Sequence, residues 1–352
     1  MTLDSQSYSF ETGMYRPPSE GGSNSLLLRF TRNCPWNRCT FCAMYKTEKF
    51  EVRPLEAIKA DIDAMAAICD ELLALSAKSR SDGAISRDAA VKFLGKHPRL
   101  NHHEGFAMLF NWLISGGRTA FLQDANTLIM KTDDLVAALA YLRRRFTSIQ
   151  RVTTYARSRT LAQKKPEELA AIREAGLDRL HIGLETGDDE LLKQVQKGVS
   201  AEGLIKGGRK ALDAGFQVSE YWMPGLGGKA LWERHARETA RVLSAINPHY
   251  IRSRPFRPIP GTPMYEAYQN GTLKLLTPQE QLRELRVTME DLDVTGKVCF
   301  DHAGNYWRNP RGGLVFSHDY EGYQFPAEKP EVLARIVEGL KADNPMPGFL
   351  QF

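Results

Sequence analysis

Three cysteines within nine residues, Cys34, Cys39 and Cys42, constrain this chain more than any other feature of its sequence. Of the chain's five cysteines, the other two, Cys69 and Cys299, stand alone and far from this loop. A structural zinc site normally closes with a fourth protein ligand from a second close pair, and no second Cys or His pair lies nearby. Three thiolates with an open fourth position suit an iron–sulfur cluster whose last iron is left free for a small molecule.

The cysteine loop lies between a predicted strand and a predicted helix. The apolar run 25–30 precedes it, and Pro54 opens a helix in which apolar residues recur every three or four positions. Cys69 falls on this apolar stripe, so we expect a buried core thiol rather than a metal ligand. The adjacent pair His102 and His103 lies in a polar stretch, and neighbouring side chains on a helix point apart, so we expect no metal site there.

Five further strand-like segments follow, each separated from the next by a helical pattern and short connections. They cover residues 119–122, 151–157, 179–184, 216–223 and 250–254. Regular alternation of strand and helix predicts parallel β/α units and therefore an α/β fold. In such folds active groups collect at the C-terminal ends of the strands, which is where the unusual polar clusters of this sequence fall.

The chain outside these units divides into three parts. Residues 1–24 are polar and read as an irregular arm, and residues 76–105 interrupt the pattern as an insertion with short helical pieces. Residues 266–352 form a C-terminal extension, irregular and aromatic from about residue 292, which we expect to cover the barrel. Near its start, Thr277-Pro278-Gln279-Glu280 has the spacing of a helix capping box.

The cysteine loop resembles the cluster loop of the radical S-adenosylmethionine (radical SAM) enzymes. In that family three cysteines hold a 4Fe–4S cluster, and the amino and carboxylate groups of SAM bind the fourth iron. The commonest family spacing is CX3CX2C, whereas this chain has CX4CX2C, which leaves the three-thiolate arrangement intact but weakens any transfer of loop geometry. Phe41, just before the third cysteine, matches the aromatic residue that lies by the adenine.

The resemblance covers residues 25–265 and implies a partial (β/α)6 TIM-like barrel that is open on one side. Three runs look closest to the branch of the oxygen-independent coproporphyrinogen oxidase-like and Elongator-catalytic-subunit-like proteins: Thr154–Arg157, Gly183–Gly187 and Gly225–Gly228. By resemblance, an external reductant of the flavodoxin or ferredoxin type supplies one electron, SAM is cleaved reductively, and the 5′-deoxyadenosyl radical abstracts a hydrogen atom from the substrate.

The resemblance also implies cofactor contacts at the ends of the second and third strands. Gln123, Asp124 and Asn126 occupy the place that contacts the methionine amine, and carboxylate and amide oxygens could accept from an ammonium group. A helix N-cap or an Asx turn is the alternative interpretation of these residues. Arg157, with Arg159 as the alternative candidate, matches a basic residue that pairs with the SAM carboxylate, against a surface salt bridge.

At the ends of the fourth and fifth strands the resemblance implies contacts to the nucleoside. Glu185 corresponds to a polar residue that bonds the ribose hydroxyls, against a simple helix cap. Gly225 and Gly227 would let the backbone approach the adenine ring, against an ordinary tight turn.

The candidate substrate residues lie on the fifth and sixth predicted strands. Arg252 and Arg254 alternate along the sixth strand and so share one face, near Trp222 on the adjacent strand. An aromatic wall with paired guanidinium groups suits a small organic anion with a carboxylate or phosphate. A structural ion pair is the alternative for the two arginines, because buried charge is costly unless it is paired.

Composition bounds the remaining possibilities. The net charge is +5, which is far from that of a nucleic-acid-binding tail, and no apolar run approaches the roughly 20 residues that span a bilayer. The N-terminus lacks a signal-peptide pattern and the cysteines do not form a secreted disulfide framework, so we expect a cytoplasmic enzyme without membrane association. The alternatives are a tRNA-modifying radical SAM enzyme and a non-catalytic iron–sulfur or zinc binding protein.

Overall fold

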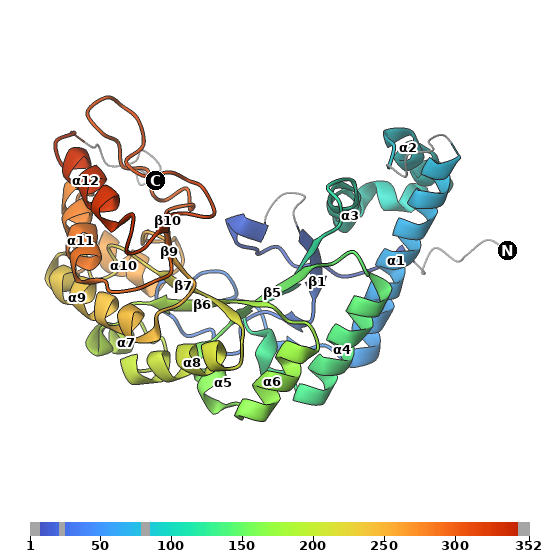
Figure 1. Cartoon of the computed structure of the whole chain (residues 1–352), viewed down its shortest axis with the longest axis horizontal. Coiled ribbons are helices and arrows are strands. Elements are labelled where there is room, and N and C mark those ends of the chain that lie inside the picture. The colour runs from blue at the N-terminus through green and yellow to red at the C-terminus, as the bar shows by residue number, and fades with distance from the viewer. Residues whose placement is uncertain (1–7, 21–24, 79–84, 344–352) are drawn as a thin grey trace. The chain divides into compact units, whose positions relative to one another are not determined.

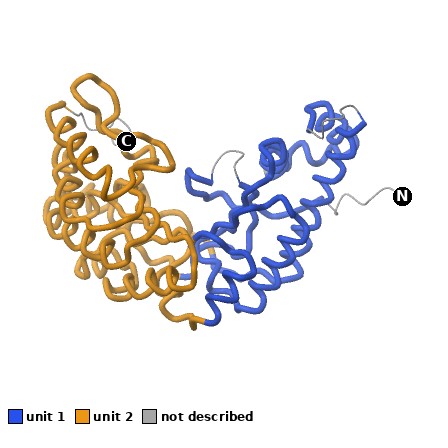
Figure 2. Tube along the Cα trace, viewed as in Figure 1, with its two compact units in different colours: residues 1–35, 49–155, 167–179 blue, residues 36–48, 156–166, 180–352 orange. Residues whose placement is uncertain are grey.

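The computed structural model describes residues 8–20, 25–78 and 85–343. The chain forms two compact units (Figure 2). The first unit comprises residues 1–35, 49–155 and 167–179, and the second comprises residues 36–48, 156–166 and 180–352. The predicted N-terminal arm and the predicted insertion at 76–105 lie partly outside the described residues.

The fold is α/β, with eight strands assigned to one mostly parallel sheet and a separate two-stranded ribbon, which confirms the predicted fold class. The strands are β1 (Ser25–Arg29), β2 (Thr31–Arg32), β3 (Glu51–Val52), β4 (Thr119–Gln123), β5 (Arg151–Ala156), β6 (Arg179–Glu185), β7 (Gln217–Trp222), β8 (Tyr250–Ser253), β9 (Lys297–Cys299) and β10 (Tyr323–Gln324). The six strands predicted from the sequence are β1 and β4 to β8, each within one or two residues at its ends.

In the first unit β4 pairs in parallel with β1 on one side and β5 on the other, while β2 and β3 form the antiparallel ribbon. Its helices are α1 (Leu55–Ala77), α2 (Arg87–Lys96), α3 (Glu104–Ile114), α4 (Thr132–Arg145) and α6 (Pro166–Glu174), with short 3-10 helices at Pro18–Glu20, Pro98–His102 and Thr127–Ile129. The predicted apolar stripe of α1 is buried, and Cys69 on it is 4% exposed, so this thiol belongs to the core.

In the second unit β7, β8 and β9 run parallel, and β10 pairs antiparallel with β9. Its helices are α5 (Ser158–Gln163), α7 (Asp189–Gln194), α8 (Ala201–Asp213), α9 (Gly228–Ile246), α10 (Pro263–Gln269), α11 (Pro278–Asp291) and α12 (Lys329–Gly339). Helix α11 packs against both α9 and α12 (Figure 1). No helix in the described part of the chain is both long and apolar enough to cross a lipid bilayer.

The C-terminal extension contains two short strands and helix α12 where the sequence predicts irregular structure from about residue 292, and its role as a cover of the barrel stays a prediction. It adds β9 and β10 to the edge of the sheet, and its aromatic side chains Phe300, Trp307 and Phe316 enter the same apolar core as Trp222. Burial of aromatic surface on this scale is a large favourable term, which explains why these residues are ordered against the sheet. The predicted capping box at α11 is confirmed, with both reciprocal hydrogen bonds between Thr277 and Glu280 present.

Glu284 of α11 holds the loop that follows β7. Its Oε1 accepts a hydrogen bond from the backbone N–H of Gly225 at 2.7 Å, and burial raises the pKa of Glu284 to about 8. The nearby His235 Nε2, 3.7 Å from the same carboxyl oxygen, is no cation, because burial lowers the pKa of His235 to about 4. Both side chains are therefore largely uncharged at neutral pH, and Glu284 binds Gly225 as a neutral acid.

This raised pKa predicts a pH-dependent stability. Because the folded-state pKa of Glu284 lies above its ordinary value, the stability that the buried acid contributes is fully present below about pH 4.5 and is lost as the pH rises through about 8. The melting temperature of Glu284→Gln, measured relative to that of wild type, should therefore rise between about pH 5 and about pH 9. Glu290→Gln, at an exposed position of the same helix, is the matched control. A constant difference in melting temperature over this range would contradict a buried, protonated Glu284.

Candidate active site

Asp124 links the end of β4 to the start of the cysteine loop in the first unit. Its side chain is 1% exposed, and Oδ2 accepts from Arg29 Nε at 2.9 Å and from the backbone N–H of Asn33 at 2.8 Å. Asn33 directly precedes Cys34, so the carboxylate fixes the backbone that presents the first thiol. The other oxygen, Oδ1, is buried without a hydrogen-bond partner in the described part of the chain. Asp124 therefore combines a structural role with one free, buried acceptor.

Gln123 and Asn126, predicted beside Asp124, are also buried. The Gln123 amide bonds the N-terminal arm: Oε1 accepts from the Gly13 N–H at 2.8 Å, and Nε2 donates to the carbonyls of Gly13 and Tyr15. The arm approaches so closely that a Cβ on Gly13 would lie 2.6 Å from Asp124 Oδ1. The described part of the predicted irregular arm thus covers the predicted cofactor contacts of the first unit, which the sequence did not indicate.

In the second unit, the part of the loop that carries Cys39 and Cys42 is tied down at Thr40. The Thr40 N–H donates to the Val195 carbonyl at 3.0 Å, and its carbonyl accepts from the Met264 N–H at 3.2 Å. Phe41 is half-buried and packs on an apolar cluster with Val195 and Leu226. Since Leu226 lies between Gly225 and Gly227, the predicted adenine-side residues Phe41, Gly225 and Gly227 are brought to one region of this unit.

Two cations stand near Cys39. Burial raises the pKa of the Cys39 thiol, and the positive charges of Lys197 and Arg157 oppose that rise. Arg157 Nη2 donates to the Lys197 carbonyl at 2.7 Å, and Lys46 Nζ donates to the Cys39 carbonyl at 2.9 Å. A thiolate is the metal-binding form of cysteine, so neighbouring cations favour the state that a cluster requires.

Lys197 forms an ion pair with Glu185, the residue predicted to contact the ribose. Lys197 Nζ lies 2.8 Å from Glu185 Oε1, and the two side chains are only 11% and 13% exposed. Glu185 ends β6 with a φ of 65°, a left-handed conformation that turns its carboxylate away from the regular strand direction. The pair is well placed to present one anchored carboxylate beside Cys39.

Glu220 is a second carboxyl group in the same place, and sequence reasoning missed it. It is fully buried in β7, and neither carboxyl oxygen has a hydrogen-bond partner in the described residues. Burial raises its pKa well above the ordinary value, and the charge of Lys197 only partly offsets this. Glu220 and Glu185 therefore share one nearby cation, and burial favours the neutral form of Glu220.

The residues predicted for the substrate have partners within the chain. Arg252 is buried, pairs with Asp301 at 3.0 Å, and donates to Ser219 Oγ and the Tyr320 carbonyl. Trp222 packs in the hydrophobic core. Arg254 alone of the three is exposed. These contacts account for Arg252 and Trp222 without a substrate, and their substrate role stays a prediction.

The predicted residue Arg254 belongs to a cluster of basic groups whose other members the sequence analysis did not predict. Burial, together with the charges of Arg254, Arg257 and His318, lowers the pKa of His302 to about 4. Arg257 lies 5.5 Å from the ring centroid of Tyr306, and both line a small pocket that also includes Gly225. We name Arg254, Arg257, His302 and His318 the basic cluster. Arg254 and Arg257 supply its positive charge, because His302 is neutral at pH 7, and Arg257 lies beside the loop of the predicted adenine contact.

Lys197 and the basic cluster left little trace in the sequence. Lys197 follows a six-residue helix that was not predicted, and its importance depends on Glu185, twelve positions earlier. Glu220 did leave a signal, because it is the one acidic residue in a strand that is otherwise apolar, aromatic or uncharged.

The donor set fits an iron–sulfur cluster better than a single metal ion. A structural zinc site normally requires a fourth protein ligand, whereas a 4Fe–4S cluster can take three thiolates on three of its irons and leave the fourth iron open. Cys34, Cys39 and Cys42 form no disulfide among the described residues and are partly exposed, whereas Cys69 and Cys299 are buried.

Comparison with known proteins gives the family. The sequence profile of the radical SAM superfamily matches residues 28–239. The heme chaperone HemW of Bacillus subtilis is 26% identical over 172 residues, which cover 44% of this chain and 45% of HemW. A tRNA uridine(34) acetyltransferase of Methanocaldococcus infernus is 26% identical over 118 residues, 33% of this chain and 22% of that enzyme. The chain thus spans less than half the length of these relatives.

Among solved structures, the radical SAM methyltransferase TsrM of Kitasatospora setae aligns with a TM-score of 0.46 at 14% identity, covering 90% of this chain and 52% of TsrM. The superfamily match extends over more than half of the sequence and includes the cysteine loop, β4 and β6. The chain therefore belongs to the radical SAM superfamily, as the sequence predicts, and is an enzyme of the class that works with a 4Fe–4S cluster and S-adenosylmethionine.

Proposed function

We propose that this protein cleaves S-adenosylmethionine reductively and uses the resulting radical to abstract a hydrogen atom from a small organic anion. The observation that carries the proposal is the arrangement around Cys39, where a cluster-type thiol, the Lys197–Glu185 ion pair and the Arg157 guanidinium meet in one unit. When bound, the cluster and SAM supply the electron transfer and the 5′-deoxyadenosyl radical. The protein's own residues bind and orient the cofactors and the substrate, and they exclude water from the site.

The residues near Cys39 divide these tasks. Cys34, Cys39 and Cys42 would hold the cluster. The Glu185 carboxylate can accept hydrogen bonds from two ribose hydroxyls, because its contact with Lys197 fixes its position. Neutral Glu220 can donate a proton in a hydrogen bond, which an ionised carboxylate cannot do. Gly225, held by Glu284, would leave room for the adenine ring.

The basic cluster supports an anionic substrate. The Arg254 N–H donates to the Trp222 carbonyl and the Phe256 N–H to the Pro224 carbonyl, so the segment after β8 is fixed against the loop after β7. Arg257 on this segment is half-buried, and burial lowers its pKa. A partly desolvated guanidinium gains most from a carboxylate or phosphate that can bond it at two points.

A tRNA-modifying role is the second candidate, because one relative is named for its action on tRNA uridine 34. Such an enzyme would use a basic surface for RNA, and the predicted insertion at 76–105 is the place for it. There, Lys96 and His97 both bond Glu71, each at 3.1 Å, which reduces the net positive charge. A gel shift with bulk tRNA at physiological salt tests this role, and tight, strongly salt-dependent binding would favour it over the small anion.

The first test of the proposal is cluster assembly and SAM cleavage. Anaerobically reconstituted wild type should bind about four irons per chain and, with dithionite, release 5′-deoxyadenosine and methionine. Cys39→Ala should lose most of the iron and all of the cleavage, because one iron loses its thiolate. Cys69→Ala, at a core cysteine, should keep both. Stoichiometric zinc in place of iron in the wild type would contradict the proposal.

The second test concerns the Glu185 carboxylate. Glu185→Gln should raise the Kd for SAM about ten- to a hundredfold, the value of one charge-assisted hydrogen bond of roughly 1.5–3 kcal/mol, while the iron content stays at the wild-type level. Equilibrium dialysis with labelled SAM measures this. Glu190→Gln, at an exposed position of α7, is the matched control.

Removing Glu185 alone also leaves Lys197 buried and unpaired. The double variant E185Q/K197M removes both charges and separates this structural cost from the loss of a SAM contact. If the double variant binds SAM as tightly as wild type, Glu185 is a structural partner of Lys197 and no ribose ligand.

A further inference from the structure

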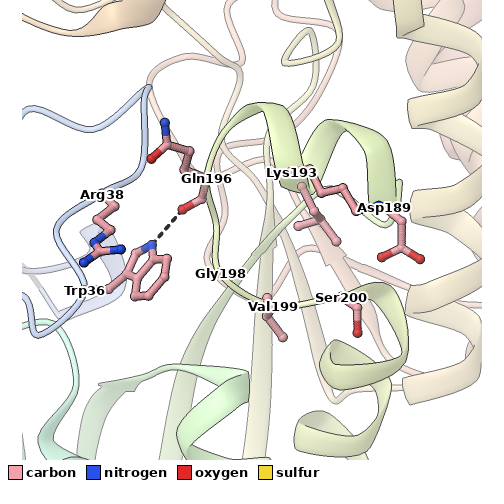
Figure 3. Close-up of a pocket in the computed structure, with 9 residues that line it drawn as sticks. Trp36, Arg38, Asp189, Lys193, Gln196, Gly198, Val199 and Ser200 are labelled. Atoms are coloured by element: carbon pink, nitrogen blue, oxygen red, sulfur yellow. Dashed lines mark hydrogen bonds between the residues drawn. The ribbon is translucent and has the colours of Figure 1, made fainter.

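A second pocket, of about 470 Å³, lies on the surface of the second unit, at the cysteine loop (Figure 3). Trp36 and Arg38 of that loop form one wall, and Lys193 of α7 and Ser200 at the start of α8 belong to the other. The indole N–H of Trp36 donates to the Gln196 carbonyl at 2.7 Å across the pocket (Figure 3). None of the functions assigned above uses this pocket.

The surface around Trp36 is strongly basic. The Cζ atoms of Arg38, Arg157 and Arg159 lie 5.1, 5.1 and 5.9 Å from the centroid of the Trp36 indole. Arg38, Arg159 and Lys193 are exposed, and no carboxylate in the part of the chain that the structure describes forms an ion pair with any of them. We name Trp36, Arg38, Arg159 and Lys193 the Trp36 patch. It presents two exposed arginines over one aromatic ring and a third exposed cation, Lys193, in the lining of the same pocket.

One turn connects the Trp36 patch to the environment of Cys39. The carbonyls of Gln196, Lys197 and Gly198 accept from Trp36, Arg157 and Arg159 in turn, at 2.7, 2.7 and 3.4 Å. Trp36 rests directly on the turn, since a Cβ on Gly198 would come within 2.3 Å of its ring. On its other side, the turn directs the Lys197 ammonium to Glu185 near Cys39. The Trp36 patch therefore lies on one side of this turn, and the Lys197–Glu185 pair near Cys39 lies on the other.

We propose that the Trp36 patch is the docking site of an acidic one-electron carrier protein, of the flavodoxin or ferredoxin class. The inference rests on the proposed function, which requires an electron from outside the chain. In the transfer, the reduced carrier loses one electron and the cluster gains it, with no bond made or broken and no proton moved. A site for this transfer must lie at the surface next to a cluster thiolate, and the Trp36 patch does.

The composition of the patch favours an acidic protein over other partners. Exposed, unpaired cations attract a partner that presents carboxylates and raise the rate of productive encounter. Transient electron-transfer complexes bury little area, which matches a compact patch around one indole. An RNA would require an extended basic track along its phosphates, whereas this patch gathers around a single indole ring.

The test compares two reductants on cluster-loaded protein. Dithionite is small and needs no docking site, whereas flavodoxin with its NADPH-dependent reductase must dock. With R38E/K193E, the rate of 5′-deoxyadenosine formation should fall about tenfold or more with flavodoxin and stay unchanged with dithionite. The wild-type rate with flavodoxin should also fall steeply with added salt. R283E/R311E makes the same change in net charge at exposed positions outside the patch and should leave both rates unchanged.

Each other result has a distinct meaning. If wild type forms no 5′-deoxyadenosine with dithionite, the proposed function itself fails. An unchanged flavodoxin rate in R38E/K193E overturns the docking site, and equal losses with both reductants overturn it by placing these residues in the cofactor site instead. If R38E/K193E loses binding to bulk tRNA in a gel shift and keeps its flavodoxin rate, the patch is an RNA surface and the proposal is wrong.

Discussion

The nearly buried ion pair between Lys197 and Glu185 is the interaction on which the second unit's part of the site depends. Burying two charges is costly, and the cost is recovered only when geometry and additional contacts are good. Lys197 belongs to a turn whose backbone carbonyls accept hydrogen bonds from Trp36, Arg157 and Arg159. The position of Lys197 is therefore fixed independently of its contact with Glu185. The pair is therefore less a source of stability than a device that fixes one carboxylate beside Cys39.

The same ion pair affects the protonation of Glu220. With a single buried ammonium close to two carboxyl groups, only one of the two can be ionised at moderate cost. Glu185 has the direct contact with Lys197, and Glu220 has no hydrogen-bond partner in the described residues, so Glu220 carries the proton. An ion-paired acceptor, Glu185, and a buried carboxyl group that favours its neutral form, Glu220, then stand on adjacent strands. Glu185 and Glu220 are residues of the same chemical type, so their different hydrogen-bonding roles arise from burial.

The sequence was sufficient for the parts of the fold that repeat. Each of the six core strands carries apolar residues in a short segment, helical patterns separate most of these segments, and α1 has a long apolar stripe, so local pattern and final structure agree. Helices α5 and α7 escaped prediction because six residues cannot show helical periodicity, and β9 and β10 because two or three residues gain their strand character only by pairing with β8 and with each other.

The site residues also differ in whether the sequence predicted them. Cys34, Cys39 and Cys42 are close in sequence, so their spacing alone carried the chemistry, and the superfamily match agrees with it. Lys197, Glu220 and the basic cluster depend on side chains that meet only after folding. For Arg252 the strand position left a substrate role and a structural ion pair both open, and its partner Asp301 lies 49 positions later, where nothing in the sequence indicated the pairing.

Positive charge is concentrated at two places in the second unit, and the difference in their burial indicates different partners. In the basic cluster, Arg257 and His302 are partly withdrawn from water, and burial lowers the pKa of both. A small anion can enter such a site and replace the lost hydration with direct hydrogen bonds. At the Trp36 patch the cations are exposed and keep their hydration, so each contact there is weak and is screened by salt. Useful attraction then requires many carboxylates on one surface, which a protein provides and a metabolite does not. The two sites can therefore work in one enzyme without competing for the same ligand.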